Sequence, residues 1–267
     1  MIKLIASDLD GTLLLNDAQS LNPELFDLIL KLKEKGIHFI AASGRQYASM
    51  HRLFAPIKDQ ISYITENGSL CFHEGEITSM ETMDRELGLR ILEDIHNRKN
   101  CHILLSCQDT YYTDSEKVFY HMRDTLHSDI KLVPDVSEIQ EPFLKIAVYD
   151  DVTIADTARY FYEKYNDLIP VATSGTVWVD FVLPNANKGT ALQAFAEYFH
   201  VKPEECMAFG DQQNDIEMLE FAGESYAMEK AAPGVASHAK YTTDCVEDVL
   251  RELLKTLYAT LSYKSCR

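Results

Sequence analysis

Short apolar segments alternate with a helical pattern at the start of the chain, and this alternation constrains the fold more than any other feature. Residues 2–7, 37–42 and 61–65 are apolar runs of strand length. Between the first two, residues 23–35 repeat apolar side chains at helical spacing, and Gly36 follows as a helix stop. Strand, helix and strand in this order predict a parallel sheet with helices on its faces.

The same alternation returns after Pro184. Helical patterns at 188–200 and 214–222 flank an apolar strand at 206–209, and another strand follows at 224–228. The two stretches together predict one doubly wound α/β domain that is built from separate parts of the chain.

The stretch between them has a different pattern. Adjacent short strands at 102–106 and 110–113, with helical patterns beside them, predict an antiparallel sheet with helices on one face. We therefore expect an α+β domain at 83–183, inserted into a core domain made of 1–82 and 184–267.

The charge of the chain excludes two classes of partner. The sequence has 42 acidic and 25 basic side chains, which gives a formal charge of -17. Such a surface repels nucleic acid and anionic membranes, so we expect neither as a partner. A phosphorylated substrate would need local positive charge, from a metal ion or a placed Lys or Arg. The oligomeric state is left open.

The cysteines and the N-terminus indicate a cytoplasmic protein. The six cysteines form no Cys-x-x-Cys pair and no zinc spacing with the histidines, so reduced thiols are favoured over a metal or redox role. The first apolar run is too short for a signal peptide, and no stretch approaches the roughly 20 apolar residues that cross a bilayer.

Asp8 and Asp10 follow the first predicted strand, and Gly11 permits a tight turn after them. Ligands of open α/β sheets bind beyond the carboxyl ends of the strands, which is where these carboxylates are expected. One carboxylate can attack phosphorus, and the other can protonate a leaving group and then deprotonate water. The structural alternative is a pair of turn or capping aspartates.

Ser43 and Gly44 follow the second predicted strand. The Ser43 hydroxyl can cap the next helix, which would be a structural role. It can equally form a phosphate cradle with the free N–H groups at the start of that helix. The segment alone leaves both interpretations open.

Lys188 lies where the core pattern resumes, at the start of a predicted helix. A positive charge is slightly unfavourable there because of the helix dipole. Neutralising a phosphate and the carboxylate that attacks it would explain the position. A solvated surface lysine is the alternative.

Asp211, Asn214 and Asp215 follow another apolar strand that ends in glycine. If this strand neighbours the first, three or four carboxylates including Asp8 converge, and a hard cation such as Mg²⁺ would relieve their repulsion. The alternative is that Asn214 and Asp215 only cap the next helix.

Taken in order, these motifs resemble the four motifs of the haloacid dehalogenase-like hydrolase superfamily. The large insert, preceded by Glu66-Asn67-Gly68, is similar to that of its Cof-type branch with an α/β cap. The motifs span residues 8 to 215 and read as follows: Asp8-x-Asp10-Gly11-Thr12, Ser43-Gly44-Arg45, Lys188-Gly189, and Gly210-Asp211-x-x-Asn214-Asp215.

The resemblance implies a Rossmann-like core, a cap that closes over the substrate, and Mg²⁺ as cofactor. It implies that Asp8 is the nucleophile and Asp10 the general acid and base. Mg²⁺ would be bound by Asp8, the backbone carbonyl of Asp10 and Asp211, with Asp215 supporting the metal directly or through another ligand. The remaining motif residues would hold the phosphate: Thr12, Ser43, Gly44, Lys188 and Asn214.

The expected function is a phosphatase that acts on a small phosphorylated metabolite, such as a sugar phosphate or a flavin-pathway intermediate. A phosphomutase on the same fold is one alternative, and it would need several cap arginines to hold a second phosphate. The candidates are Arg85, Arg90, Arg98, Arg123 and Arg159. The second alternative is a catalytically silent binding protein on the same fold. Such a protein would be expected to have lost Asp8, Asp10, Lys188 or Asp211.

The sequence does not name the substrate. Cap residues that could contact it are Trp178, Tyr111, Tyr112 and His121, although each is better explained as cap core or surface. One departure from the family pattern is Asn187, where a small residue usually precedes the motif lysine.

Overall fold

The computed structural model describes residues 1–16, 18–125, 128–174 and 176–265, except the side chains of residues 260–265. Its contacts divide the chain into two compact units. The first comprises Met1–Arg45, Met50–Ser79 and Asn187–Arg267, and the second comprises Gln46–Ser49 and Met80–Ala186. The assignment of catalytic and cap roles to the two predicted domains stays a prediction.

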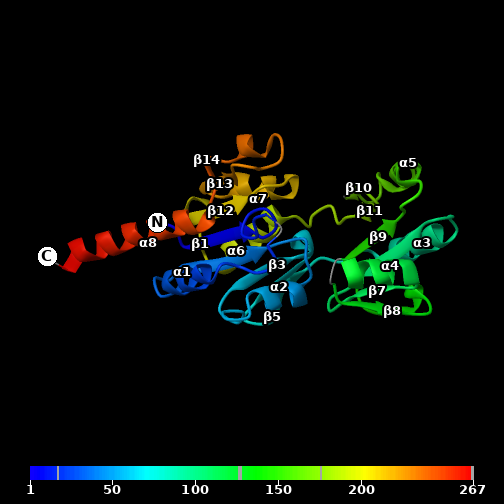
Figure 1. The fold of residues 1–267 in the computed structure, drawn as a ribbon, viewed down its shortest axis with the longest axis horizontal. Helices are drawn as coiled ribbons and strands as arrows, with labels where there is room; N and C mark the ends of the chain where they lie inside the picture. The colour runs from blue at the N-terminus through cyan, green and yellow to red at the C-terminus, as the bar shows by residue number, and fades with distance from the viewer. Residues whose placement is uncertain (17, 126–127, 175, 266–267) are drawn as a thin grey trace. The chain divides into compact units, whose positions relative to one another are not determined.

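The first unit contains an eight-stranded sheet (Figure 1). Its strands, in spatial order, are β14 (Tyr241–Thr243), β13 (Glu224–Met228), β12 (Cys206–Gly210), β1 (Leu4–Asp8), β2 (His38–Ala42), β3 (Ser62–Thr65), β4 (Leu70–His73) and β5 (Glu76–Met80). The six from β14 to β3 run parallel, and β4 is antiparallel to β3.

The α-helices that lie wholly or mostly in this unit are α1 (Pro23–Lys33), α2 (Tyr47–Leu53), α6 (Lys188–Tyr198), α7 (Ile216–Phe221) and α8 (Val246–Ser265). Helix α1 shows how the sequence sets its bounds. Asn22 accepts a hydrogen bond from the Glu24 N–H, Pro23 occupies the first turn, and Lys31 and Lys33 lie in the last. Its apolar stripe is buried.

Helices cover both faces of the core sheet. Alternate strand residues such as Leu4, Ala6 and Ile40 pack with α6 and α7 in one apolar cluster. On the opposite face, Phe39 and Tyr63 pack against the Phe54 ring after α2. The predicted doubly wound, Rossmann-like α/β core is therefore confirmed.

The register of the central strands brings the predicted site motifs to one sheet edge. Asp8 is aligned with Ala42 in the parallel β1–β2 pair, and Ser7 is aligned with Phe209 in the β1–β12 pair. Residues that follow these strands therefore leave the sheet side by side.

The second unit contains a six-stranded sheet in the spatial order β10-β11-β9-β6-β7-β8. The strands are β10 (Val171–Ser174), β11 (Trp178–Phe181), β9 (Lys145–Tyr149), β6 (His102–Ser106), β7 (Tyr111–Thr113) and β8 (Ile130–Leu132). Its α-helices are α3 (Arg85–His96), α4 (Glu116–Tyr120) and α5 (Ile154–Tyr165). The α+β character expected of the insert is confirmed.

Two expectations for this sheet were wrong. Strand β8 pairs parallel to β7, so the sheet is mixed and not wholly antiparallel. Helices also pack on both faces. Ile103 and Leu105 face the cluster that contains α3 and α5, whereas Leu104, between them, faces a second cluster with Val118 of α4.

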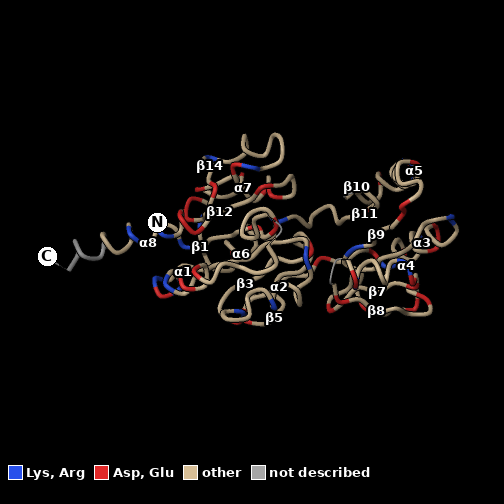
Figure 2. Tube along the Cα trace, viewed as in Figure 1, with Lys and Arg blue, Asp and Glu red and all other residues tan. Residues whose placement is uncertain are grey.

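No helix in the described part of the chain is long and apolar enough to span a membrane. None of the five described cysteines is in a disulfide, and Cys266 lies outside the described residues. Asp and Glu occur along the backbone of both units, as Figure 2 shows.

Candidate active site

A buried lysine joins two buried carboxylates at the carboxyl edge of the core sheet. Lys188 Nζ lies 2.6 Å from Asp8 Oδ1 and 2.6 Å from Asp215 Oδ1, and the lysine side chain is 1% exposed. Its position follows from the capping box that begins α6, in which Asn187 and Thr190 exchange hydrogen bonds. The helix start thus holds a positive charge against Asp8.

Burial and charge act in opposite directions on the pKa values of this group. Burial lowers the pKa of Lys188, but the attraction of Asp8 and Asp215 outweighs it and raises the pKa, so the lysine is protonated. Burial raises the pKa of Asp8 to about 8, although Lys188 opposes the change and Asp215 adds to it. The charged form of Asp8 therefore needs a positive charge in addition to that of Lys188 to be stable at this buried position.

Three carboxylates converge here with the donor chemistry of a hard-cation site. One oxygen each of Asp8, Asp211 and Asp215 lies within 4.8 Å of the others. Asp8 Oδ2 is buried and has no hydrogen-bond partner among the described residues. Burial also raises the pKa of Asp211. Oxygen ligands of this kind fit Mg²⁺. The ion would stabilise the ionised forms of these carboxylates, which burial disfavours.

Gly11 makes the close approach of Asp211 possible. Its φ of 91° lies in the left-handed region, and a Cβ there would lie 2.3 Å from Asp211 Oδ2. Any larger residue would therefore displace the carboxylate. Thr12 Oγ1 and Gln212 Nε2 then donate hydrogen bonds to Asp211 at 3.2 and 2.7 Å. Thr12 thus contacts a predicted metal ligand, and its phosphate-binding role stays a prediction.

Both oxygens of Asp215 already accept hydrogen bonds from the protein. Oδ1 accepts from Lys188, and Oδ2 accepts from the backbone N–H groups of Asp211 and Gln212 at 2.9 Å each. Asp215 is 0% exposed. Its carboxylate therefore fixes both the lysine and the loop that carries Asp211.

Asp10 lies outside the three-carboxylate cluster. Its side chain is 53% exposed and accepts two hydrogen bonds from the Arg45 guanidinium. An exposed carboxylate beside the cluster suits proton exchange with solvent better than metal binding. The expected metal contact of Asp10 is through its backbone carbonyl, and this stays a prediction.

Ser43, Gly44 and Asn214 form a second group. Ser43 is buried, and its Oγ accepts from the Arg45 N–H at 3.2 Å, a contact within the loop and not a helix cap, because α2 begins only at Tyr47. Asn214 Nδ2 donates to Asn67 Oδ1 at 2.9 Å, and a Cβ on Gly44 would lie 3.0 Å from the same Asn67 oxygen. Asn67 thus brings Gly44 and Asn214 together.

Three site residues were given no role from the sequence: Arg45, Asn67 and Gln212. Arg45 and Asn67 stood inside motifs that were recognised, and their contacts depend on loop packing that spacing does not reveal. The signal available for Asn67 was Asn-Gly after a buried strand, which indicates a turn.

The four cap residues considered for specificity divide into two pairs. Tyr111 and Tyr112 are buried in the second unit. His121 and Trp178 are half-buried and contact the Tyr149 ring. Four of the five cap arginines already have partners within this unit: Arg85, Arg98, Arg123 and Arg159.

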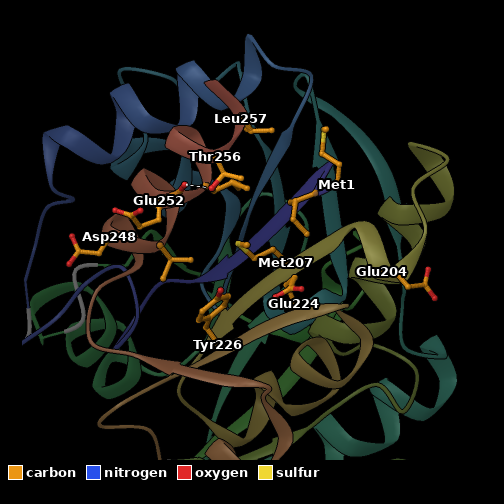
Figure 3. Close-up of a pocket in the computed structure, with 12 residues that line it drawn as sticks. Met1, Glu204, Met207, Glu224, Tyr226, Asp248, Glu252, Thr256 and Leu257 are labelled. Carbon is orange, nitrogen blue, oxygen red and sulfur yellow. Dashed lines mark hydrogen bonds between the residues drawn. The ribbon is translucent and has the colours of Figure 1, made fainter. Parts of the chain in front are cut away.

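A pocket of about 720 Å³ lies at the opposite edge of the core sheet (Figure 3). Ile2 before β1, Met207 in β12 and Glu224 at the start of β13 line it, together with residues of α8 such as Leu253. None of the predicted site residues lines this pocket, so we do not assign the chemistry to it.

The fold and the site define an α/β enzyme whose acidic centre lies at the carboxyl edge of a parallel sheet. The chain belongs to the haloacid dehalogenase-like hydrolases, whose family model matches residues 5–253. The predicted family is thus confirmed, and the named relatives of the chain include phosphatases.

Relatives of known name and structure cover nearly the whole chain. A 5-amino-6-(5-phospho-D-ribitylamino)uracil phosphatase of Escherichia coli, YbjI, is 29% identical over 95% of this chain and 97% of its own length. YitU of Bacillus subtilis bears the same enzyme name and is 28% identical over 96% of this chain and 97% of its own length. A solved structure from Eubacterium rectale is 32% identical, covers 94% of this chain and 99% of its own, and superposes with a TM-score of 0.87.

Proposed function

We propose that the protein is a Mg²⁺-dependent phosphatase that hydrolyses small phosphorylated metabolites through an aspartyl-phosphate on Asp8. The observation that carries the proposal is the buried contact of Lys188 with Asp8 Oδ1, which leaves Asp8 Oδ2 without a partner among the described residues. A carboxylate held by one oxygen presents the other for attack.

In the first step, a carboxylate oxygen of Asp8 forms a bond to phosphorus while the bond from phosphorus to the leaving oxygen breaks. Asp10 donates a proton to that leaving oxygen. In the second step, Asp10 takes a proton from water, the water oxygen bonds to phosphorus, and the acyl-phosphate bond breaks. Inorganic phosphate leaves and Asp8 is restored.

The other site residues support these steps by charge and position. Lys188 offsets the negative charge of Asp8 and of the transferred group, and Ser43, Gly44, Thr12 and Asn214 would hold the phosphate oxygens. Mg²⁺, held by Asp8, Asp211 and the Asp10 backbone carbonyl, would supply positive charge to the phosphoryl group. Asp215 would act by fixing Lys188 and the Asp211 loop, since three hydrogen bonds already occupy its oxygens.

The names of two relatives support a substrate class. YbjI and YitU, from different bacteria, are both phosphatases of 5-amino-6-(5-phospho-D-ribitylamino)uracil. We propose this flavin-pathway class first and sugar phosphates second. A phosphomutase has less support, because most of the cap arginines contact neighbours in their own unit. The cytoplasmic location stays a prediction.

The test is phosphate release from a panel of phosphorylated metabolites, with and without Mg²⁺. The panel holds this aminouracil phosphate, several sugar phosphates and p-nitrophenyl phosphate. We expect Asp8→Asn to lower kcat by roughly 10³-fold or more, because the nucleophile is lost. The matched control is Asp27→Asn on the exposed face of α1, which should leave kcat unchanged. Full activity of Asp8→Asn would exclude the mechanism.

A further inference from the structure

Three consecutive residues after β3 have left-handed backbone conformations. The φ angles of Glu66, Asn67 and Gly68 are 49°, 56° and 104°. Residues other than glycine adopt this conformation mainly where the surrounding structure holds them. The turn from Glu66 to Gly68 is therefore under a constraint that its neighbours must supply.

Backbone hydrogen bonds fasten this turn to the Ser43–Arg45 loop. The Glu66 N–H donates to the Arg45 carbonyl at 3.1 Å, and the Asn67 N–H donates to the Ser43 carbonyl at 3.0 Å. Through these bonds the turn holds in place the Ser43–Arg45 loop, in which we propose a phosphate cradle.

The third residue of the turn packs on the segment that precedes Lys188. A Cβ on Gly68 would lie 2.4 Å from the Asn187 carbonyl oxygen and 3.1 Å from its backbone nitrogen. Only glycine permits this approach. The turn therefore contacts two of the loops that carry the proposed phosphate-binding residues.

The side chain of Asn67 reaches the third such loop. Every residue from 61 to 72 is buried except Asn67, which is half-buried. Its carboxamide lies 3.0 to 3.3 Å from where a Gly44 Cβ would be, and its Oδ1 accepts from Asn214 Nδ2 at 2.9 Å. Among the described residues this is the one side-chain hydrogen bond that Asn214 makes.

We propose that Asn67 is a positioning residue, which orients the carboxamide of Asn214 toward the substrate phosphate. An amide nitrogen has two N–H groups, so donating one to Asn67 fixes the direction of the other. The second N–H of Asn214 is then directed at a phosphate oxygen. This inference rests on the proposed phosphate-binding role of Asn214.

The test is a double-mutant cycle with Asn67→Gly, Asn214→Ala and the double variant. Glycine at position 67 retains the left-handed backbone and removes only the carboxamide. The readouts are the affinity for inorganic phosphate in Mg²⁺, measured by calorimetry, and kcat and KM for p-nitrophenyl phosphate. We expect Asn67→Gly to weaken phosphate binding by roughly three- to tenfold, the size of one neutral hydrogen bond. The double variant should bind no more weakly than Asn214→Ala alone.

The matched control is Asn100→Gly in the second unit, an exposed asparagine with a φ of 64°. It should leave phosphate affinity unchanged. Wild-type affinity in Asn67→Gly, or losses that simply add in the double variant, would overturn the proposal.

Failure of the proposed function is recognised separately. It would appear as retained turnover in Asp8→Asn. The double-mutant cycle of Asn67 and Asn214 measures phosphate affinity and does not require turnover. Wild-type protein that binds no phosphate in Mg²⁺ would overturn the role of Asn67 whatever the outcome at Asp8.

Discussion

Arg45 holds Asp10 through two hydrogen bonds, from Nε to Oδ2 at 2.9 Å and from Nη2 to Oδ1 at 2.6 Å. A guanidinium that engages both oxygens of a carboxylate fixes its plane as well as its position. Arg45 thereby holds the Asp10 side chain next to the cluster of Asp8, Asp211 and Asp215 but outside it. The arrangement separates the group proposed to transfer protons from those proposed to bind metal and phosphorus.

Replacing Arg45 by alanine tests this positioning. We expect kcat for p-nitrophenyl phosphate to fall about tenfold, since a misplaced acid and base loses part of its contribution. The free energy of unfolding should change by no more than about 1 kcal/mol, because the pair is largely exposed. Arg251→Ala, which breaks an exposed pair with Glu24 on α1, is the matched control and should keep full activity. Equal kcat in the two variants would contradict the role of Arg45.

Replacing Lys188 by methionine tests the charge balance of the buried cluster. The change leaves Asp8 and Asp215 buried without their cation, which should lower the free energy of unfolding by about 3–5 kcal/mol near neutral pH. The pKa of Asp8 is already raised to about 8 in the folded protein, so ionising it opposes folding as pH rises. Without Lys188 the pKa of Asp8 in the folded protein should rise further, so the loss should be larger at about pH 9.5 than at about pH 6, as measured by urea unfolding. A loss that is the same at both pH values would show that Lys188 does not balance these carboxylates.

Mg²⁺ affinity should depend on pH through the same carboxylates. The pKa values of Asp8 and Asp211 are raised by burial, so protons compete with the cation in the metal-free protein. Affinity should rise with pH until about pH 8, and binding should release protons below that pH. Calorimetry in two buffers of different ionisation enthalpy measures both quantities. Asp8→Asn should bind Mg²⁺ more weakly and with less pH dependence. Affinity that does not vary with pH would argue against a carboxylate site at Asp8.

Much of the core could be predicted because its strands and helices carry strong periodic patterns. Asn22, Pro23 and Gly36 mark the bounds of α1 in the sequence itself. Once β1, β2 and β12 are recognised as neighbouring parallel strands, their carboxyl ends must meet at one edge. The proximity of Asp8, Asp211 and Asp215 follows from that topology.

The second unit was predicted less completely for a physical reason. Strand β8 is short and largely exposed, so it lacks the apolar pattern by which a strand is recognised. Leu104 and Leu105 face opposite clusters, and a run of apolar residues does not reveal that both faces are covered. The contacts of Arg45 and Asn67 were missed because they join loops whose packing depends on the whole fold.

Asp150, at the end of β9, offers a test of stability in the second unit. It is 0% exposed and accepts hydrogen bonds from the Val152 N–H, from Thr153 through both N–H and hydroxyl, and from the Thr157 hydroxyl, at 2.7 to 2.9 Å. Burial alone would raise the pKa of Asp150, but these donors outweigh it and lower the pKa to about 2. A lowered pKa stabilises the fold above the unfolded value of about 4, and this contribution, about 2 kcal/mol, is lost as pH falls toward 2.

We therefore expect Asp150→Ala to destabilise the second unit near neutral pH. The free energy of unfolding of the variant should also fall less steeply than that of the wild type as the pH is lowered from about 4 to 2. The change also leaves several donors unsatisfied, so the neutral-pH loss should be about 2–4 kcal/mol. Trp178, the one tryptophan of the chain, lies in β11 and reports unfolding of this unit by its fluorescence. Asp167→Asn, at an exposed position of the same unit, is the control, and its stability should fall in acid as steeply as that of the wild type. An Asp150→Ala protein whose stability also falls in acid as steeply as that of the wild type would show that the Asp150 carboxylate does not stabilise the fold in this way.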